Sequence, residues 1–113
     1  LAYLSGDDFT VLPYIACGGH GVISVVANVA PRTMKDLVVT ARGGDLARAL
    51  TLQAAMAELN RVMFVETNPG PVKAAVALLG KAPPDLRLPL VPVSEASLQK
   101  IRAAMQRFGL TLA

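Results

Sequence analysis

Apolar residues follow two patterns along this chain, and each pattern predicts a different kind of element. Residues 21–26 form a β-branched, almost continuous apolar run, which is typical of a strand buried on both faces of a parallel sheet. The apolar run at residues 1–4 predicts another strand. Between the two runs, Asp8 is placed to cap a short helix that Gly18-Gly19 ends. This order predicts a βαβ unit with a right-handed parallel crossover.

Helical spacing of apolar residues dominates the rest of the chain, and the breaks between segments carry helix start and stop signals. Pro31 suits the first turn of a helix that Gly43-Gly44 ends, and Ser94 is placed to cap a helix that Gly109 ends. Four helices are therefore predicted, over residues 31–42, from 45 into the mid-sixties, over 71–79 and over 95–108. Residues 82–93 contain four prolines and predict an extended connector.

The two predicted strands need more partners than this sequence provides. Two parallel strands buried on both faces do not form a stable sheet alone, because three or more strands or extensive cover are usually required. Four helices would cover the faces but would leave both strand edges unpaired. The pattern therefore predicts the C-terminal piece of a larger α/β protein.

Composition excludes several classes of protein. Of the 113 residues 53% are apolar and the net charge is +3, which is too apolar and too weakly charged for a disordered chain. Cys17 is the single cysteine, so a disulfide scaffold is excluded. No uninterrupted apolar run reaches the ~18 residues of a spanning helix, and the first residues lack the basic start of a signal peptide. Basic residues stand singly and aromatic residues make up 4%, so we expect neither nucleic-acid nor membrane binding.

The turn Ser5-Gly6-Asp7-Asp8 is the first candidate site. It follows a predicted strand and precedes a predicted helix, and parallel α/β folds bind ligands at the carboxyl ends of their strands. Gly6 would let a ligand approach the backbone closely. The alternative is structural: Gly6 serves the turn and Asp8 caps the helix, with Asp7 favouring its dipole.

Other polar residues have weaker claims to chemistry. The glycines around His20 follow a helix and enter a strand, which is the wrong order for a phosphate loop. His20 is the only histidine, and we expect no metal site. Ser24 and Asn28 are polar groups in an apolar element, so they either satisfy neighbouring backbone or lie near a small ligand. The same two alternatives hold for the Thr67-Asn68 break. Lys73 lies in a first helical turn, where nothing would make it a Schiff-base nucleophile.

These motifs together resemble the 4-hydroxy-tetrahydrodipicolinate synthases (dihydrodipicolinate synthases). The resemblance covers essentially the whole chain and preserves the order of its motifs. It is carried by residues 4–8 (Leu-Ser-Gly-Asp-Asp), 18–25 (Gly-Gly-His-Gly-Val-Ile-Ser-Val), 27–29 (Ala-Asn-Val), 64–73 (Phe-Val-Glu-Thr-Asn-Pro-Gly-Pro-Val-Lys) and 86–90 (Leu-Arg-Leu-Pro-Leu).

The resemblance implies an α/β fold, a (β/α)8 TIM barrel followed by a C-terminal helical extension. On this mapping, residues 1–5 are the seventh strand and residues 21–26 the eighth, so residues 1–44 hold the last two βα units. Residues 45–113 form the helical extension. The family assembles as homotetramers, and the stretch Leu12–Cys17 maps to a surface used between dimers.

The resemblance also implies a lyase of lysine biosynthesis through the diaminopimelate route, which condenses pyruvate with L-aspartate 4-semialdehyde. Pyruvate forms a Schiff base with a lysine on the sixth strand, which this chain lacks. No catalytic residue is therefore expected here, and no metal or cofactor. Ile23, through its backbone, and Gly6 are expected to contact pyruvate, while Asn68 and Ser5 support the pocket.

As an isolated chain, the protein is expected to be inactive and cytoplasmic. Two alternatives stay open. One is another pyruvate-dependent aldolase of the same superfamily, acting on a sugar-derived 2-oxo acid. The other is a non-enzymatic helical module for oligomerisation.

Overall fold

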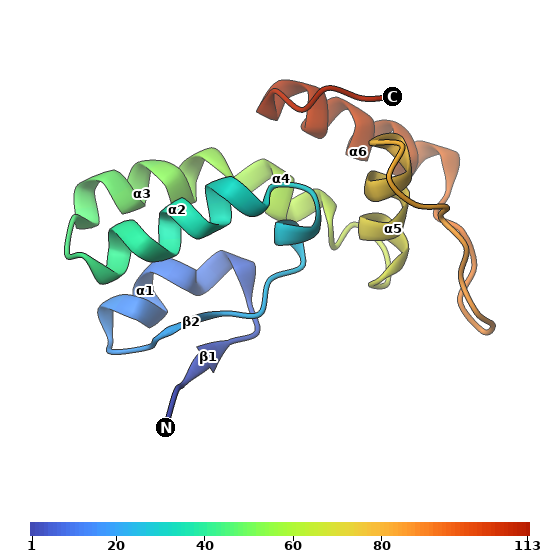
Figure 1. The fold of residues 1–113 in the computed structure, drawn as a ribbon. Coiled ribbons are helices and arrows are strands. Elements are labelled where there is room, and N and C mark those ends of the chain that lie inside the picture. Colours follow the sequence, from blue (N-terminus) through green and yellow to red (C-terminus); the bar gives the residue numbers. More distant parts are fainter. The chain divides into compact units, whose positions relative to one another are not determined.

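The computed structural model describes residues 1–113 and divides them into two units, Leu1–Ala57 and Glu58–Ala113. Figure 1 labels the α-helices and strands of both units and colours the chain in sequence order. The predicted division at residue 44 concerns a barrel and its extension, and it stays a prediction. None of the helices is both long and apolar enough to cross a membrane.

The first unit contains the predicted parallel pair of strands, but the first strand begins only at Leu4, whereas the sequence predicted residues 1–4. Strand β1 (Leu4–Ser5) pairs with β2 (Gly21–Val22), with Leu4 opposite Gly21 and Ser5 opposite Val22. Figure 1 shows helices of this unit stacked beside the strands, and α2 contacts both α1 and α3. The remaining elements are the short 3-10 helices η1 (Asp8–Thr10) and η2 (Val26–Asn28) and the helices α1 (Val11–Ala16), α2 (Pro31–Arg42) and α3 (Leu46–Ala55).

The core of the first unit lies where these elements face one another. Val11 of α1, Val26 of η2 and Leu37 of α2 are fully buried, as are Ala49 of α3 and Met56 just beyond it. These buried side chains form the core of this unit.

The second strand is much shorter than predicted and is not buried on both faces. Its pairing ends at Val22, whereas the sequence predicted a strand to residue 26, and Ile23 is 72% exposed. Two effects end it. The backbone amides of Val25 and Val26 both donate to the Asp8 carboxylate, at 3.1 Å each. The hydroxyl of Ser24 accepts from the backbone N–H of Ala27, at 2.9 Å, and this bond starts the turn of η2.

Asp8 does not cap the first helix as predicted, because Asp7 takes that role. The Asp7 carboxylate accepts from the Phe9 backbone N–H at 3.3 Å and from the Thr10 hydroxyl at 2.6 Å. Asp8 is instead only 1% exposed and points at the segment that follows β2. The two adjacent aspartates thus have different roles: Asp7 caps the helix start, and Asp8 is buried and binds backbone amides.

The long helix predicted from Asp45 into the mid-sixties is also wrong, since it is broken at Met56. Helix α3 ends at Ala55, and α4 (Ala57–Val62) follows. The spacing of Leu52, Met56 and Leu59 continues across the break. Apolar periodicity alone therefore could not locate this break.

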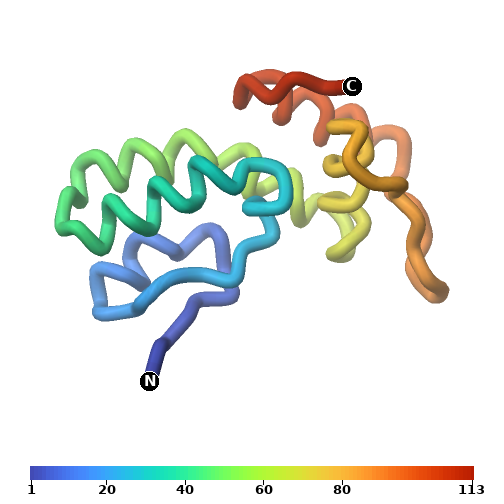
Figure 2. Tube along the Cα trace, viewed as in Figure 1, coloured from blue at the N-terminus to red at the C-terminus, as the bar shows by residue number.

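The second unit contains α4, α5 (Gly70–Leu78) and α6 (Glu95–Phe108). Its core includes Leu59, Met63, Ala75, Ile101 and Met105, all fully or almost fully buried. Figure 2 shows that the connector between α5 and α6 is extended, as its prolines predict. The peptide bonds Asn68-Pro69 and Leu88-Pro89 are cis.

The start and stop signals of the last helix are confirmed. The Ser94 hydroxyl accepts from the backbone N–H of Ser97 at 3.3 Å, and this bond satisfies a free donor of the first turn. Gly109 ends the helix with φ at +95°, a conformation that other residues rarely adopt.

We predict that Gly109→Ala lowers the free energy of unfolding by about 1–2 kcal/mol, since a Cβ is strained in the left-handed region. No atom lies within 4 Å of the added Cβ, so the loss would report backbone strain alone. Urea unfolding of the chain measures it. Gly109→Asn is the matched control, and it should lose less, because asparagine tolerates this region. Equal stability of the alanine variant and the wild-type chain would contradict the prediction.

Candidate functional site

The structure brings together three of the four predicted site residues at the carboxyl ends of the two strands. Ser5 ends β1 and is buried, and Gly6 follows it at the surface. The backbone N–H of Ile23, the first residue after β2, donates to the carbonyl of Ser5 at 2.8 Å. Parallel sheets present their ligand sites at this edge. The geometry therefore places Gly6 and Ile23 side by side on adjacent strand ends.

The backbone of Ile23 has one group left for a ligand. Its N–H is used by the bond to Ser5, which extends the parallel pairing by one residue. Its carbonyl oxygen is the remaining polar group, and its side chain is 72% exposed. A contact between this backbone and a small molecule would therefore be made by a hydrogen-bond acceptor.

Ser5 holds the turn that carries Gly6. Its hydroxyl accepts from the Asp7 backbone N–H at 3.1 Å and donates to the Asp7 carbonyl at 3.3 Å. A Cβ on Gly6 would meet no atom within 4 Å. Packing within this unit therefore does not require a glycine here. A reason that remains is the close approach of another group to the Gly6 backbone.

Sequence reasoning named Asp8 at this site but missed what it binds, and it missed Gln53 altogether. The Asp8 carboxylate accepts from two successive amides after Ile23, those of Val25 and Val26. The side chain of Gln53, on α3, donates to the Asp8 carbonyl at 3.0 Å and accepts from the Leu12 backbone N–H at 3.2 Å. The available signal was an acidic residue directly beside an apolar helix start. Nothing in the sequence points to Gln53, which is 45 residues away.

Asn68 belongs to the second unit, where it lies exposed in the bend before α5. Its part in a common site with Gly6 and Ile23 stays a prediction.

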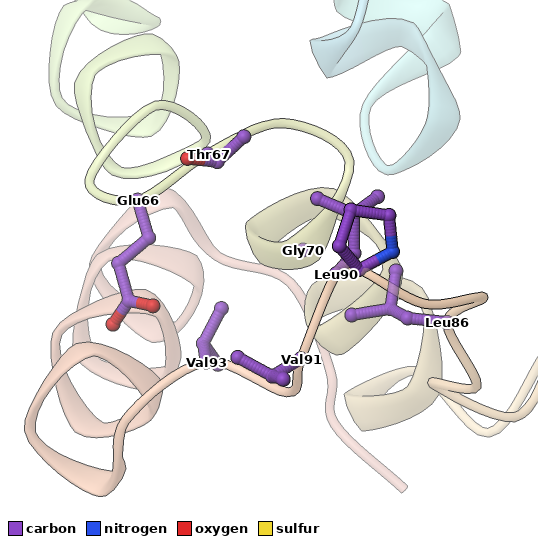
Figure 3. A pocket seen from close by; sticks show the side chains of 8 residues that line it. Glu66, Thr67, Gly70, Leu86, Leu90, Val91 and Val93 are labelled. Carbon is purple, nitrogen blue, oxygen red and sulfur yellow. The ribbon is translucent and has the colours of Figure 1, made fainter.

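A cavity of about 340 Å³ lies beside this bend, as Figure 3 shows. In Figure 3 the Glu66 side chain and the aliphatic side chains of the connector come from opposite sides of the cavity. The residues lining it are Glu66, Thr67, Gly70, Leu86, Pro89, Leu90, Val91 and Val93. Apolar groups thus make up most of the wall.

Glu66 is the only charged group on this wall, and its carboxylate is engaged by α6. It accepts from the Ser94 hydroxyl at 2.7 Å and from the Ser94 backbone N–H at 3.0 Å. Hydrogen bonds from Ser97 and Ser94 lower the pKa of Glu66 below its ordinary value. The carboxylate therefore joins the bend after α4 to Ser94, where the connector ends and α6 begins, and the cavity presents no free catalytic group.

The remaining candidates have local structural partners. The His20 Nδ1 accepts from the Tyr3 backbone N–H at 3.1 Å, and the Asn28 amide donates to the Val25 carbonyl at 2.9 Å. Lys73 donates its Nζ hydrogen to the carbonyl of Asp85. No three side chains of His, Cys, Asp or Glu gather into a metal site. The structural alternatives raised for these residues are therefore supported.

Comparison with known proteins places the chain among enzymes of one kind. The model of the dihydrodipicolinate synthetase family matches residues 1–108. The 4-hydroxy-tetrahydrodipicolinate synthase of Anaeromyxobacter dehalogenans is 82% identical over 113 residues, which are 100% of this chain and 38% of that protein. That of Maridesulfovibrio salexigens is 55% identical over 107 residues, 95% of this chain and 37% of the relative.

Solved structures agree with this placement. Dihydrodipicolinate synthase from Aquifex aeolicus matches with a TM-score of 0.97 and 42% identity, over 99% of this chain and 38% of that one. The chloride-inhibited enzyme from Acinetobacter baumannii, complexed with pyruvate, matches with a TM-score of 0.94 and 37% identity, over 98% of this chain and 38% of that one. The chain thus spans well under half the length of the proteins that it matches.

We predict that Ser97→Ala raises the pKa of Glu66 toward its ordinary value, because the largest stabilising hydrogen bond to the carboxylate is lost. A pH titration of the carboxyl carbon resonance by NMR measures this. Gln99→Ala is the control, since Gln99 lies on the same helix but donates to Glu95. An unchanged Glu66 titration in Ser97→Ala would show that the bond is absent in solution.

The same shift has a consequence for stability. A carboxylate whose pKa is lowered by folding stabilises the fold above its unfolded pKa, and this contribution is lost as pH falls through the folded pKa. The acid-side loss of stability should therefore be shallower in Ser97→Ala than in the wild-type chain.

Proposed function

The chain belongs to the dihydrodipicolinate synthetase family, and we propose on this premise that it forms part of a 4-hydroxy-tetrahydrodipicolinate synthase. The proposed reaction joins pyruvate to L-aspartate 4-semialdehyde, in lysine biosynthesis through the diaminopimelate route. The observation that carries the proposal is the pairing of the Gly6 turn with the Ile23 backbone at adjacent strand ends. Pyruvate as the ligand is supported by the Acinetobacter baumannii enzyme, which is described as complexed with it.

The role proposed for Ile23 follows from its remaining acceptor. In this chemistry a lysine amine adds to C2 of pyruvate and water leaves, which gives a protonated Schiff base. C3 then loses a proton to form the enamine, and the enamine carbon bonds to the aldehyde carbon while the aldehyde oxygen takes up a proton. A carbonyl oxygen accepts hydrogen bonds, so the Ile23 carbonyl would face the hydroxyl of the first adduct or the N–H of the protonated Schiff base. It would not bind the carboxylate of pyruvate, which has no donor.

The Schiff-base lysine is proposed to lie outside these residues. The four lysines of the chain are Lys35, Lys73, Lys81 and Lys100, and none stands at a strand end. This chain would supply one wall of the pocket, with Gly6 and Ile23 against pyruvate and with Ser5 and Asn68 as support. No metal or cofactor is required by this chemistry.

The incomplete sheet supports the proposed position in a (β/α)8 barrel. Each strand has only one partner, so one edge of β1 and one edge of β2 are unpaired. Leu4 is 51% exposed. A groove of about 340 Å³, lined among others by Leu4, Val22 and Val38, lies between β2 and α2. Further strands and helices would cover these surfaces, as the last two βα units of a barrel require.

Assembly and location stay predictions. The stretch Leu12–Cys17, proposed to lie between dimers of a tetramer, ends just beyond α1; Ile15 is buried, while Cys17 is exposed and free. A homotetramer in the cytoplasm remains the expectation. High identity to named synthases favours this function over an oligomerisation module and over an aldolase acting on a sugar-derived 2-oxo acid.

We predict that the chain is functional when it replaces the matching 113 residues of the Anaeromyxobacter dehalogenans synthase. This hybrid enzyme should form 4-hydroxy-tetrahydrodipicolinate from pyruvate and L-aspartate 4-semialdehyde. The isolated chain should form no borohydride-trapped pyruvate adduct, because it lacks the lysine. Intact-mass spectrometry and a coupled activity assay check both statements. A folded hybrid enzyme without activity, or an adduct on the isolated chain, would overturn the proposal.

We further predict that Gly6→Ala in the hybrid enzyme raises the KM for pyruvate by about tenfold, the effect of misplacing one contact of about 1.4 kcal/mol. Stability should not change, since the added methyl group meets no atom of its own unit. Gly43→Ala is the control, because Gly43 lies at the end of α2, away from the strand ends. Steady-state kinetics and thermal unfolding decide. An unchanged KM for pyruvate would remove Gly6 from the pocket.

A further inference from the structure

We propose that Asp8 is a positioning residue for the pyruvate pocket, and that it acts by fixing the backbone that presents the Ile23 carbonyl. This inference rests on the proposed function. It concerns a residue whose side chain touches the loop and not the substrate.

The first support is the number and place of the bonds that Asp8 makes. One carboxylate oxygen, Oδ2, accepts from the amides of Val25 and Val26, both at 3.1 Å. These amides come two and three residues after Ile23, at the start of η2, where backbone donors have no helical acceptor. The path of the chain between Ile23 and η2 is therefore held at its far end by Asp8, while Ser5 holds its near end.

The second support is burial. Asp8 is 1% exposed and Val26 is fully buried, so water does not replace the bonds between them. A carboxylate bonded to backbone amides forms charge-assisted hydrogen bonds, which are stronger than those between neutral groups. A buried charge is costly unless it is bonded in this way. These bonds therefore both offset the cost of burying Asp8 and fix the path of the loop.

The third support is a clamp on Asp8 itself. Gln53 donates to the Asp8 carbonyl and accepts from the Leu12 backbone N–H. The residue is thereby tied to α3, a regular helix of ten residues. The connection runs from α3 through Asp8 to the loop after β2. It also fixes the turn of Gly6, two residues before Asp8, so both proposed pyruvate contacts depend on it.

The hybrid enzyme is the right test, and substrate-specific kinetics separate positioning from a structural role. Asp8→Ala should raise the KM for pyruvate by about tenfold or more, because the amides of Val25 and Val26 lose their acceptor and the loop after Ile23 shifts. The KM for aspartate semialdehyde should stay within about twofold of its original value. Asp8→Asn keeps an acceptor oxygen without the charge, and it should recover much of the affinity for pyruvate.

Two further variants complete the design. Gln53→Met keeps the volume of the side chain but not its hydrogen bonds, so it should raise the same KM by about threefold, and it tests the clamp if Asp8→Ala does not fold. Asp45→Ala is the matched control. It removes another carboxylate that accepts a backbone N–H, from Arg48 at 3.1 Å, but one at the start of α3 away from the strand ends. Its KM for pyruvate should not change.

The possible results separate a failure of the proposed function from a failure of the positioning role of Asp8. An inactive, folded hybrid enzyme with the unmodified chain overturns the proposed function. An active hybrid enzyme in which the Asp8 and Gln53 variants lose stability or kcat, but keep the KM for pyruvate, overturns the positioning role. A selective rise in the KM for pyruvate, reduced in Asp8→Asn and absent in Asp45→Ala, supports it.

Discussion

The need of two backbone amides for an acceptor explains much of the first unit. The chain leaves the sheet after Val22, and the amide of Val25 is then part-buried while that of Val26 lies in the core. A buried donor without a partner costs about 1–3 kcal/mol. Asp8 supplies that partner from the turn after the other strand. The same contact therefore helps to end β2 and joins the two strand ends that carry Ile23 and Gly6.

The sheet itself contributes little to holding the unit together. Only two residue pairs of β1 and β2 are in register, with one extra backbone bond at each end, from His20 to Tyr3 and from Ile23 to Ser5. So short a pairing depends on the helices that pack beside it and on the Asp8 tie. The apolar groups left at its surface are consistent with a sheet that continues in the remainder of a barrel.

Local signals in the sequence predicted most of the helices. The helix start and stop signals act through the backbone of their own turn, so the sequence alone reveals them. Examples are Pro31, Ser94 and Gly109. The end of β2 and the break at Met56 were missed because a continuous apolar pattern covers both. Of the candidate site, the place of Gly6 at the carboxyl end of a strand followed from the strand and helix pattern, and Ile23 was expected from the family resemblance. The Asp8 bonds and the Gln53 clamp followed from neither, because they join residues 17, 18 and 45 positions apart.

On the proposed function, the distribution of charge explains how such a segment would serve a reaction whose nucleophile is proposed to lie elsewhere. At the strand ends it offers a carbonyl oxygen at Ile23 and an open approach at Gly6, and neither group changes protonation during the chemistry. Groups of this kind help only if they are held in place before substrate arrives. Asp8 can hold these groups in place because its carboxylate accepts hydrogen bonds from the amides of Val25 and Val26. A carboxylate free to face the pocket would repel the carboxylate of pyruvate, so using it internally both orders the loop and keeps the site open to an anion.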